Sequence, residues 1–308
     1  MWVIDILSRN RLRLFAQHLR AQQRPVLQEA DLAVAFLLAL RDAGDLEIPP
    51  EPAQLRRGLI HVRHALLEFG GLEAFKVAGD VHGYLVGISL PTEAEEALCS
   101  VDPFVFVSHL SAMAWHGLTD RIPTTLFATR PSATLWKNLS EARLHAELRE
   151  LFPLYLEAGF PAYRPFNASK LYRRPLNIWS SRRLDDAFHA AFKKVAEGRV
   201  RLATVARCFL DMVREPELCG GIHHVIEVYE EHASNHVETI LAEVDRHGNR
   251  IEQARVGYLL ERADPAIESH PILAAWAKKV QRGGSRKLDP SADYADRYSK
   301  RWALSINV

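Results

Sequence analysis

Apolar residues recur at helical spacing in three successive stretches near the start of the chain. Leu12, Phe15, Ala16 and Leu19 follow the i, i+3, i+4, i+7 pattern of one helix face. Residues 29–43 are apolar around much of a helical circumference, which predicts a helix that lies between two others. The third stretch has a narrower apolar stripe, so that its opposite side is free for polar side chains.

The third stretch is followed by a pattern typical of a β-hairpin. The helix begins at Pro52, a residue suited to a first helical turn. Residues 72–78 and 82–88 are then predicted as strands, joined by a turn that starts at Gly79. Three helices and a hairpin are the element order of a winged helix, whose third helix enters the major groove of DNA. We therefore expect a winged helix-turn-helix domain over residues 1–91.

The third predicted helix has no acidic residue from position 52 to 67. Its arginines suit guanine edges or phosphates, and a hairpin that follows suits the DNA backbone. The expected DNA-binding residues are Arg56, Arg57, His61, Arg63, His64, Lys76 and His82. Residues 1–90 carry 10 basic and 10 acidic residues, so the contact must come from a local face. A solvated helix face explains the same pattern equally well when the residues are taken alone.

The remainder of the chain alternates between predicted helices and strands. We expect helices at 93–99, 108–117, 138–151, 205–213, 222–241 and 251–262, and strands at 104–107, 124–129 and 199–203, with irregular strands within 160–179. Thr204 is suited to cap the helix that follows it. The fold class is thus α+β: an N-terminal winged helix, then a larger mixed α/β domain over residues 92–280.

Charge is unevenly distributed, although the formal net charge is only +1. Residues 161–207 hold 11 Lys and Arg against 3 Asp and Glu, whereas residues 208–273 hold 5 against 13. This segregation predicts a second basic surface, with Arg173, Arg174, Arg182 and Arg183 as its candidate members. Residues 281–308 form a basic tail that we expect to be only partly ordered, with Tyr294, Tyr298 and Trp302 as the residues that would pin it.

Three cysteines without paired spacing indicate a reducing compartment rather than a disulfide framework. No stretch of about 20 apolar residues suits a membrane span. The first residues lack the apolar core and cleavage site of a signal peptide. We expect a cytoplasmic protein, monomeric in solution and without a membrane partner.

Candidate catalytic chemistry is weak. His232 and His236 are four residues apart on a predicted helix, but no HExxH pattern contains them. Ser108 and Ser111 lie near histidines without the surroundings of a catalytic nucleophile. We therefore expect no catalytic residue, metal or cofactor. The alternatives that stay open are a metal-dependent nuclease or other nucleic-acid-processing enzyme, and a regulator that acts alone.

Two stretches resemble the AbiEi family of antitoxins from bacterial type IV toxin–antitoxin systems. The first matches a Ser-His-x-Ser-Ala pattern that continues into His-Gly-Leu-Thr-Asp; the second matches a strand followed by a capped helix. The positions that carry the resemblance are Ser108, His109, Ser111, His116, Gly117, Thr204, Arg207 and Asp211. The second stretch departs from the family at Ala206 and Cys208, where glutamate and threonine are common. The resemblance covers about residues 100–262.

The resemblance implies a transcriptional repressor that is not an enzyme. Such a protein would bind inverted repeats in its own promoter, and its C-terminal domain would counter a nucleotidyltransferase-like toxin without a stable complex. DNA binding thus rests on the element order together with the resemblance, whereas antitoxin activity rests on the resemblance alone.

Overall fold

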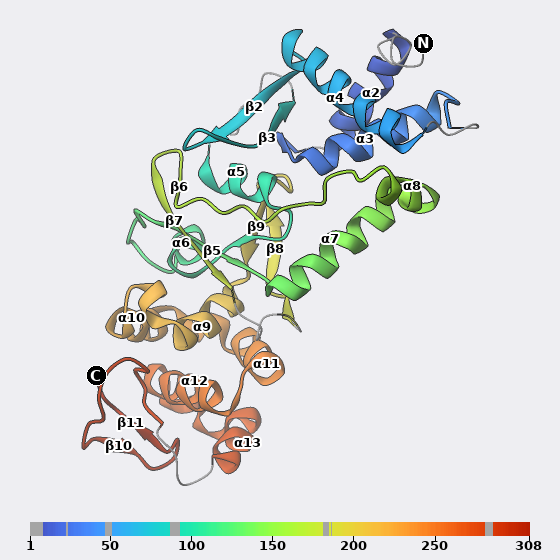
Figure 1. The fold of residues 1–308 in the computed structure, drawn as a ribbon. Coiled ribbons are helices and arrows are strands. Elements are labelled where there is room, and N and C mark those ends of the chain that lie inside the picture. Colours follow the sequence, from blue (N-terminus) through green and yellow to red (C-terminus); the bar gives the residue numbers. More distant parts are fainter. Residues whose placement is uncertain are drawn as a thin grey trace.

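The computed structural model describes residues 9–22, 24–46, 51–86, 93–180, 185, 187–280 and 286–308. Their elements form three successive layers, from the N-terminal helices through a central sheet to a helical C-terminal layer (Figure 1). The fold is α+β with a mixed sheet, as predicted.

The first layer has the predicted order of helices and hairpin. Its elements are α2 (Arg9–Ala21), β1 (Val26–Leu27), α3 (Glu29–Asp42), α4 (Pro52–Glu68), β2 (Leu72–Val77) and β3 (Asp80–Val86). The short strand β1 was not predicted, and it pairs with β3 to give a three-stranded sheet of order β1-β3-β2. Gly83 permits this pairing, because a Cβ there would lie 2.7 Å from the carbonyl oxygen of Leu27.

The second layer is built around a six-stranded sheet of order β6-β7-β5-β4-β9-β8. Its elements are α5 (Ala94–Val101), β4 (Phe106–Val107), α6 (His109–Trp115), β5 (Leu126–Arg130), α7 (Ala133–Leu148), η1 (Arg149–Leu151), α8 (Phe152–Glu157), β6 (Lys170–Leu171), β7 (Arg174–Ser180), β8 (Phe192–Val195) and β9 (Val200–Ala203). The pairs β5–β7 and β4–β9 are parallel and the other three are antiparallel. Helix α7 begins five residues before the predicted start, because the Ser132 side chain caps it.

The third layer is helical and includes the C-terminal residues. Its elements are α9 (Val205–Arg214), η3 (Pro216–Cys219), α10 (Ile222–His232), η4 (Ala233–His236), α11 (Val237–His247), α12 (Arg250–Ala263), η5 (Pro265–Ser269), α13 (Pro271–Lys279), β10 (Tyr298–Ser299) and β11 (Leu304–Ser305). The single helix predicted over 222–241 is wrong, since η4 interrupts it. Ser234 and Asn235 lie in the break, and short polar side chains of this kind favour turns over helix interiors.

The C-terminal tail also differs from its prediction. Residues 286–308 pack against the third layer, and Trp302, Leu304 and Ile306 are buried there. Trp302 does pin the segment, but Tyr294 and Tyr298 are each 55% exposed. The segment is ordered because it supplies core residues, which its polar composition conceals.

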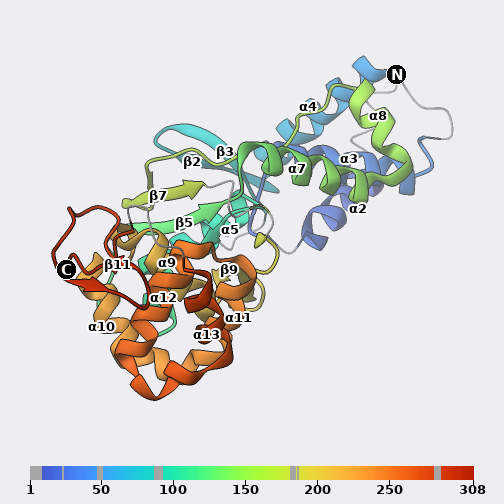
Figure 2. The same cartoon turned by 90° about the horizontal axis from the view of Figure 1, so that it is seen from below.

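A hydrophobic cluster joins the first layer of the molecule to the second layer. It contains Phe36 and Leu37 of α3 together with Leu144 and Leu148 of α7 and Tyr155 of α8. Figure 2 shows α7 and α8 running beside α3. The predicted domain boundary at residue 91 lies outside the described residues, and apolar contacts cross from one side of it to the other.

Candidate nucleic-acid interface

Helix α4 presents one apolar face inward and one basic face outward. Leu55, Gly58, Leu59 and Val62 are buried at i, i+3, i+4, i+7 spacing. On the opposite face Arg57, His61 and His64 are exposed. The His61 imidazole lies 2.7 Å from the backbone carbonyl oxygen of Arg57, and no described residue bonds to the Arg57 side chain. Three of the predicted DNA-binding residues thus share one accessible helix face.

Two other predicted residues of α4 are engaged within the protein. Arg56 donates from Nε and Nη2 to the Ala158 carbonyl oxygen at 3.0 and 2.9 Å, at the end of α8. Arg63 donates to the carboxylate of Glu29, at the start of α3. These contacts join α4 to neighbouring helices. They also engage guanidinium donors that would otherwise be free to bind DNA.

The hairpin residues lie on the side of β2–β3 that faces the central layer. Lys76 is exposed beside the two-residue turn formed by Ala78 and Gly79, both with positive φ. His82 is half-buried, and its ring packs edge-on against Phe166 at a centroid distance of 4.9 Å. Lys76 is therefore free for an external partner, whereas His82 also serves in packing.

The predicted second basic surface is only partly described. Arg173 is exposed at the tip of the β6–β7 hairpin. Arg174 donates to Glu95 at 2.6 Å and to the Pro123 carbonyl oxygen at 3.1 Å, so its guanidinium is held. Arg182 and Arg183 lie outside the described residues.

A hollow of about 560 Å³ joins the two predicted surfaces, and we call it the outer hollow. The β2–β3 hairpin lines one side with Lys76 and His82, and the β6 region lines the other with Lys170, Tyr172 and Arg173. Phe75 and Tyr172 pack edge-on at 6.4 Å, which holds the two hairpins together. Burial raises the pKa of the Tyr172 phenol. Lys170 and Asn167 were not predicted as site residues; their only signal in the sequence was membership of the basic stretch 161–207.

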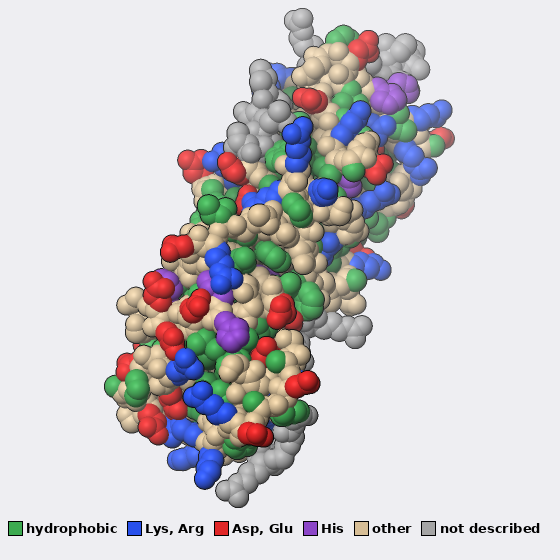
Figure 3. Space-filling view, turned by 90° about the vertical axis from the view of Figure 1, so that its left-hand side faces the viewer, with side chains coloured by type: hydrophobic (Ala, Val, Ile, Leu, Met, Phe, Trp, Pro, Cys, Tyr) green, Lys and Arg blue, Asp and Glu red, His purple; other side chains and the backbone are tan. Residues whose placement is uncertain are grey.

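The distribution of charge over the surface follows the three layers. On the face in Figure 3, Lys and Arg side chains gather mainly over the upper part, which holds the N-terminal elements. Asp and Glu side chains become more frequent over the helical third layer. The candidate interface thus belongs to the first layer and the adjoining edge of the second.

The residues that carry the AbiEi resemblance form a structural junction, in which Ser108, His109, Ser111, Arg207 and Asp211 are buried. The Ser108 hydroxyl bonds His109 Nδ1 at 2.8 Å and the Thr129 hydroxyl at 2.7 Å, and it makes no capping bond to α6. The Ser111 hydroxyl accepts from the Phe127 amide at 2.9 Å. These bonds fasten α6 to β5.

The same junction reaches the second motif. The His116 ring donates from Nε2 to the Ala203 carbonyl oxygen at 2.7 Å, across 87 positions of sequence. Thr204 caps α9, as predicted, and Gly117 has a positive φ of 68°. Arg207 donates from Nε to Asp211 Oδ1 at 2.8 Å.

Burial governs the ionisation of this junction. It lowers the pKa of His109, although the nearby Asp211 carboxylate acts in the opposite direction. Burial also lowers the pKa of His116. Arg207 Nη1 and Asp211 Oδ2 are buried without a hydrogen-bond partner among the described residues. The motif therefore positions α6, β5 and α9 relative to one another.

Other candidate chemistry is dispersed. His232 ends α10 and lies 3.8 Å from Glu231, while the His236 ring packs near Phe209. Within the described ranges, no group of three or more His, Cys, Asp or Glu is placed to hold a metal ion. Cys99, Cys208 and Cys219 are free and buried. No helix in the described part of the chain is long and apolar enough to span a membrane.

Comparisons with known proteins yield a distant structural similarity. No family model matches the chain, and no curated protein matches it. A crystal structure of the Rv2827c protein from Mycobacterium tuberculosis aligns with 96% of this chain and 90% of its own, at 11% identity and a TM-score of 0.47. This likeness is too weak to carry a conclusion about function.

Proposed function

We propose that the chain is a DNA-binding transcriptional repressor in which residues 9–86 form a winged helix. The element order α2-β1-α3-α4-β2-β3 and the sheet order β1-β3-β2 suit that fold. In this arrangement α4 is the recognition helix and the β2–β3 hairpin is the wing. The protein represses its own operon from inverted repeats in the promoter.

The exposed face of α4 carries this proposal. Arg57, His61 and His64 lie on it at i, i+4, i+7 spacing, with no acidic residue on the helix before Glu68. A helix face of this kind fits the major groove, where arginine bonds guanine edges or phosphates. Lys76 on the wing supplies a phosphate contact.

The proposed antitoxin function depends on the AbiEi resemblance. One structural observation supports it: the two motif stretches, far apart in the sequence, pack against each other through His116 and Ala203. A shared motif that builds one junction indicates a shared fold more than a shared chemistry. The partner is a nucleotidyltransferase-like toxin, countered without a stable complex.

The test of DNA binding uses the full chain and a labelled duplex that covers its own promoter. Arg57→Ala should weaken binding by about 1–3 kcal/mol if the side chain contacts a base. The triple variant Arg57→Ala/His61→Ala/His64→Ala should lose the preference for promoter over unrelated duplex. Lys278→Ala/Lys279→Ala, which removes exposed charges from α13, is the matched control. Equal binding by the triple variant and the wild type would place the DNA elsewhere.

A further inference from the structure

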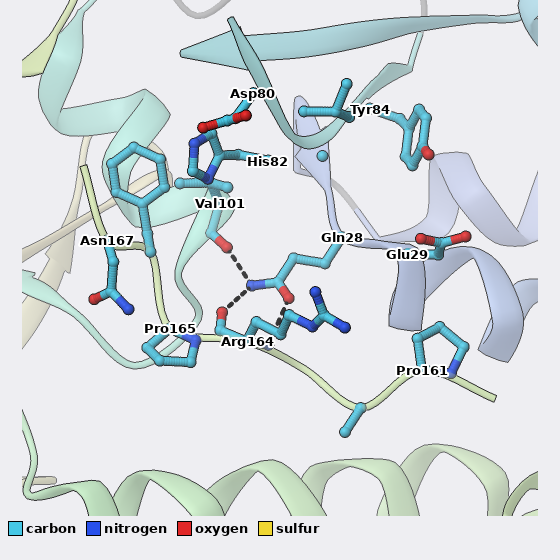
Figure 4. A pocket seen from close by; sticks show the side chains of 14 residues that line it. Gln28, Glu29, Asp80, His82, Tyr84, Val101, Pro161, Arg164, Pro165 and Asn167 are labelled. Carbon is cyan, nitrogen blue, oxygen red and sulfur yellow. Dashed lines mark hydrogen bonds between the residues drawn. The ribbon is translucent and has the colours of Figure 1, made fainter. Parts of the chain in front are cut away.

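A second hollow continues the outer hollow beneath the β2–β3 hairpin, and we call it the inner hollow. It has a volume of about 380 Å³ and lies between β3 and the extended segment 161–167 (Figure 4). Asp80, His82 and Asn167 line both hollows. The two hollows therefore adjoin at these residues, and we call them together the groove, which lies between the hairpin and the segment 161–173.

The walls of the groove are held in place by a set of polar contacts. Gln28 donates from Nε2 to the carbonyl oxygens of Val101 and Arg164, both at 2.7 Å. Its Oε1 accepts from the Arg164 amide at 2.8 Å, and Figure 4 shows this clamp at the base of the inner hollow. The Phe166 amide donates to the buried Asp102 carboxylate at 3.0 Å. The groove is preformed, so a ligand need not order its walls.

Four cationic side chains line the groove without an internal partner. They belong to Lys76, Arg164, Lys170 and Arg173. No described residue bonds or pairs with the charged end of any of these four side chains. Arg164 lines the inner hollow and the other three line the outer one. Free cations along a groove are the arrangement that tracks a phosphate backbone.

The β6–β7 hairpin has a strained backbone at its tip, which lies beside the groove. Tyr172 and Arg173 occupy the two turn positions with φ of 48° and 66°. This region is unfavourable for residues with a side chain, and such strain gathers at functional sites. The turn leaves Tyr172 44% exposed beside the cations, where a base can stack on its ring.

The inner hollow has a different chemical character. It combines the acceptor carboxylate of Asp80, the imidazole of His82 and the donor and acceptor amide of Asn167. Its other acid, Glu29, is paired with Arg63. The negative charge of Asp80 disfavours a carboxylate ligand in the inner hollow. A neutral heterocycle with amino and carbonyl groups on its edge suits these donors and acceptors. The volume is enough for one base.

We propose that this groove binds a single strand of nucleic acid. Phosphates lie along Lys76, Lys170 and Arg173, and an unpaired base enters the inner hollow between His82, Asn167 and Arg164. A base stacked within a duplex cannot enter such a hollow unless it is extruded. The site is separate from the exposed face of α4, so it goes beyond the proposed binding of promoter duplex.

The test measures fluorescence anisotropy with a labelled oligonucleotide of about 12 nucleotides, as DNA and as RNA, against the same sequence in a blunt duplex. The full chain should prefer the single strand. Lys170→Ala/Arg173→Ala should weaken that binding about tenfold and reduce its salt slope by about 1.4. Asn167→Ala should abolish the preference for the single strand and leave the salt slope unchanged.

The matched control is Lys193→Ala/Lys194→Ala on β8, at the opposite edge of the same sheet, which removes the same charge from exposed positions. It should bind as the wild type does. Three results would each overturn the proposal: equal binding of duplex and single strand, equal losses in the β6 and β8 variants, or an unchanged preference in Asn167→Ala. The α4 triple variant should keep single-strand binding, so a failure of promoter binding remains distinguishable.

Discussion

The indole of Trp302 lies directly against Gly257, such that a Cβ at position 257 would come within 2.2 Å of the ring. Gly257 is in the interior of α12, where glycine costs about 1 kcal/mol relative to alanine. The glycine is tolerated because it lets the C-terminal segment dock its largest side chain on the helix. This contact makes residues 286–308 part of the third layer.

Gly257→Ala should therefore destabilise the protein despite the better helix propensity of alanine. The added methyl group cannot fit unless the indole moves, and overpacking of this kind costs about 1–3 kcal/mol. Trp302→Ala should cost about 3–5 kcal/mol through the cavity it leaves. Urea unfolding of each variant measures both values. A stabilised Gly257→Ala would mean that the C-terminal segment is not docked in solution.

The ion pair of Arg207 and Asp211 should behave as a buried pair. Their side chains are only 5% and 4% exposed. Removing one partner, as in Asp211→Leu, leaves a buried unpaired charge and should cost about 3–5 kcal/mol. The double variant Arg207→Met/Asp211→Leu should recover much of that loss, because no charge then stays unpaired.

The matched control for this pair is Lys137→Ala on α7, since Lys137 and Glu141 have the same spacing but are 76% and 60% exposed. That change should alter the free energy of unfolding by about 0–1 kcal/mol at most. A double variant at 207 and 211 that is less stable than either single one would contradict the argument.

Gln28 provides a third test, because its amide joins the first layer to the segment that floors the inner hollow. Gln28→Glu replaces the donor by a carboxylate that faces the carbonyl oxygens of Val101 and Arg164. We expect Gln28→Glu to be more destabilising than Gln28→Ala, which should cost about 1–3 kcal/mol through the lost bonds. Thermal unfolding at neutral pH compares the two. If the Gln28 side-chain amide were solvated instead, Gln28→Glu would be less destabilising than Gln28→Ala.

Local sequence predicted the elements better than it predicted their contacts. Periodicity identified α3 and α4, and capping chemistry identified the start of α9 at Thr204, because both depend on residues within one or two turns. It missed α13 and joined α10 to α11. Short helices and breaks carry weak local signals, and their packing determines where they end.

The candidate site was harder to predict than the fold. Sequence placed Arg56, Arg57 and Arg63 together, but contacts with Ala158 and Glu29 divide them into held and exposed residues. Those partners lie 102 and 34 positions away. The groove likewise depends on two hairpins that lie about 100 residues apart in the sequence and meet through Phe75 and Tyr172. No local pattern encodes such proximity.

Stability should fall on mild acidification. Burial lowers the pKa of His109, His116 and His224 below the usual 6.5, so the unfolded chain binds more protons than the folded chain in that range. Their contribution is complete above about pH 6.5 and is lost as the pH falls towards the folded values. Urea unfolding at about pH 7.5 and about pH 5.5 measures the difference. His109→Gln should reduce it, and an unchanged difference would assign the effect to other groups.

The apolar contact between α3 and α7 affects how the two proposed functions can be separated. A fragment of residues 92–308 would expose Leu144, Leu148 and Tyr155, which α3 and its neighbours cover in the full chain. We expect this fragment to self-associate, as measured by light scattering, because a large exposed apolar patch favours association. A monomeric fragment with the stability of the full chain would show that the contact contributes little.

The separation is therefore better made with point variants in the full chain. Arg57→Ala/His61→Ala/His64→Ala changes only exposed side chains of α4, so folding should be retained. In cells that carry a promoter fusion and the toxin gene, we expect this variant to lose repression and still rescue growth, since the two functions occupy different surfaces. Asp211→Leu, which disrupts the motif junction, should impair rescue through loss of folded protein, and its soluble level is measured alongside. If the α4 variant lost repression and rescue together while its protein level stayed normal, neutralisation would be transcriptional only, and the two-function proposal would be wrong.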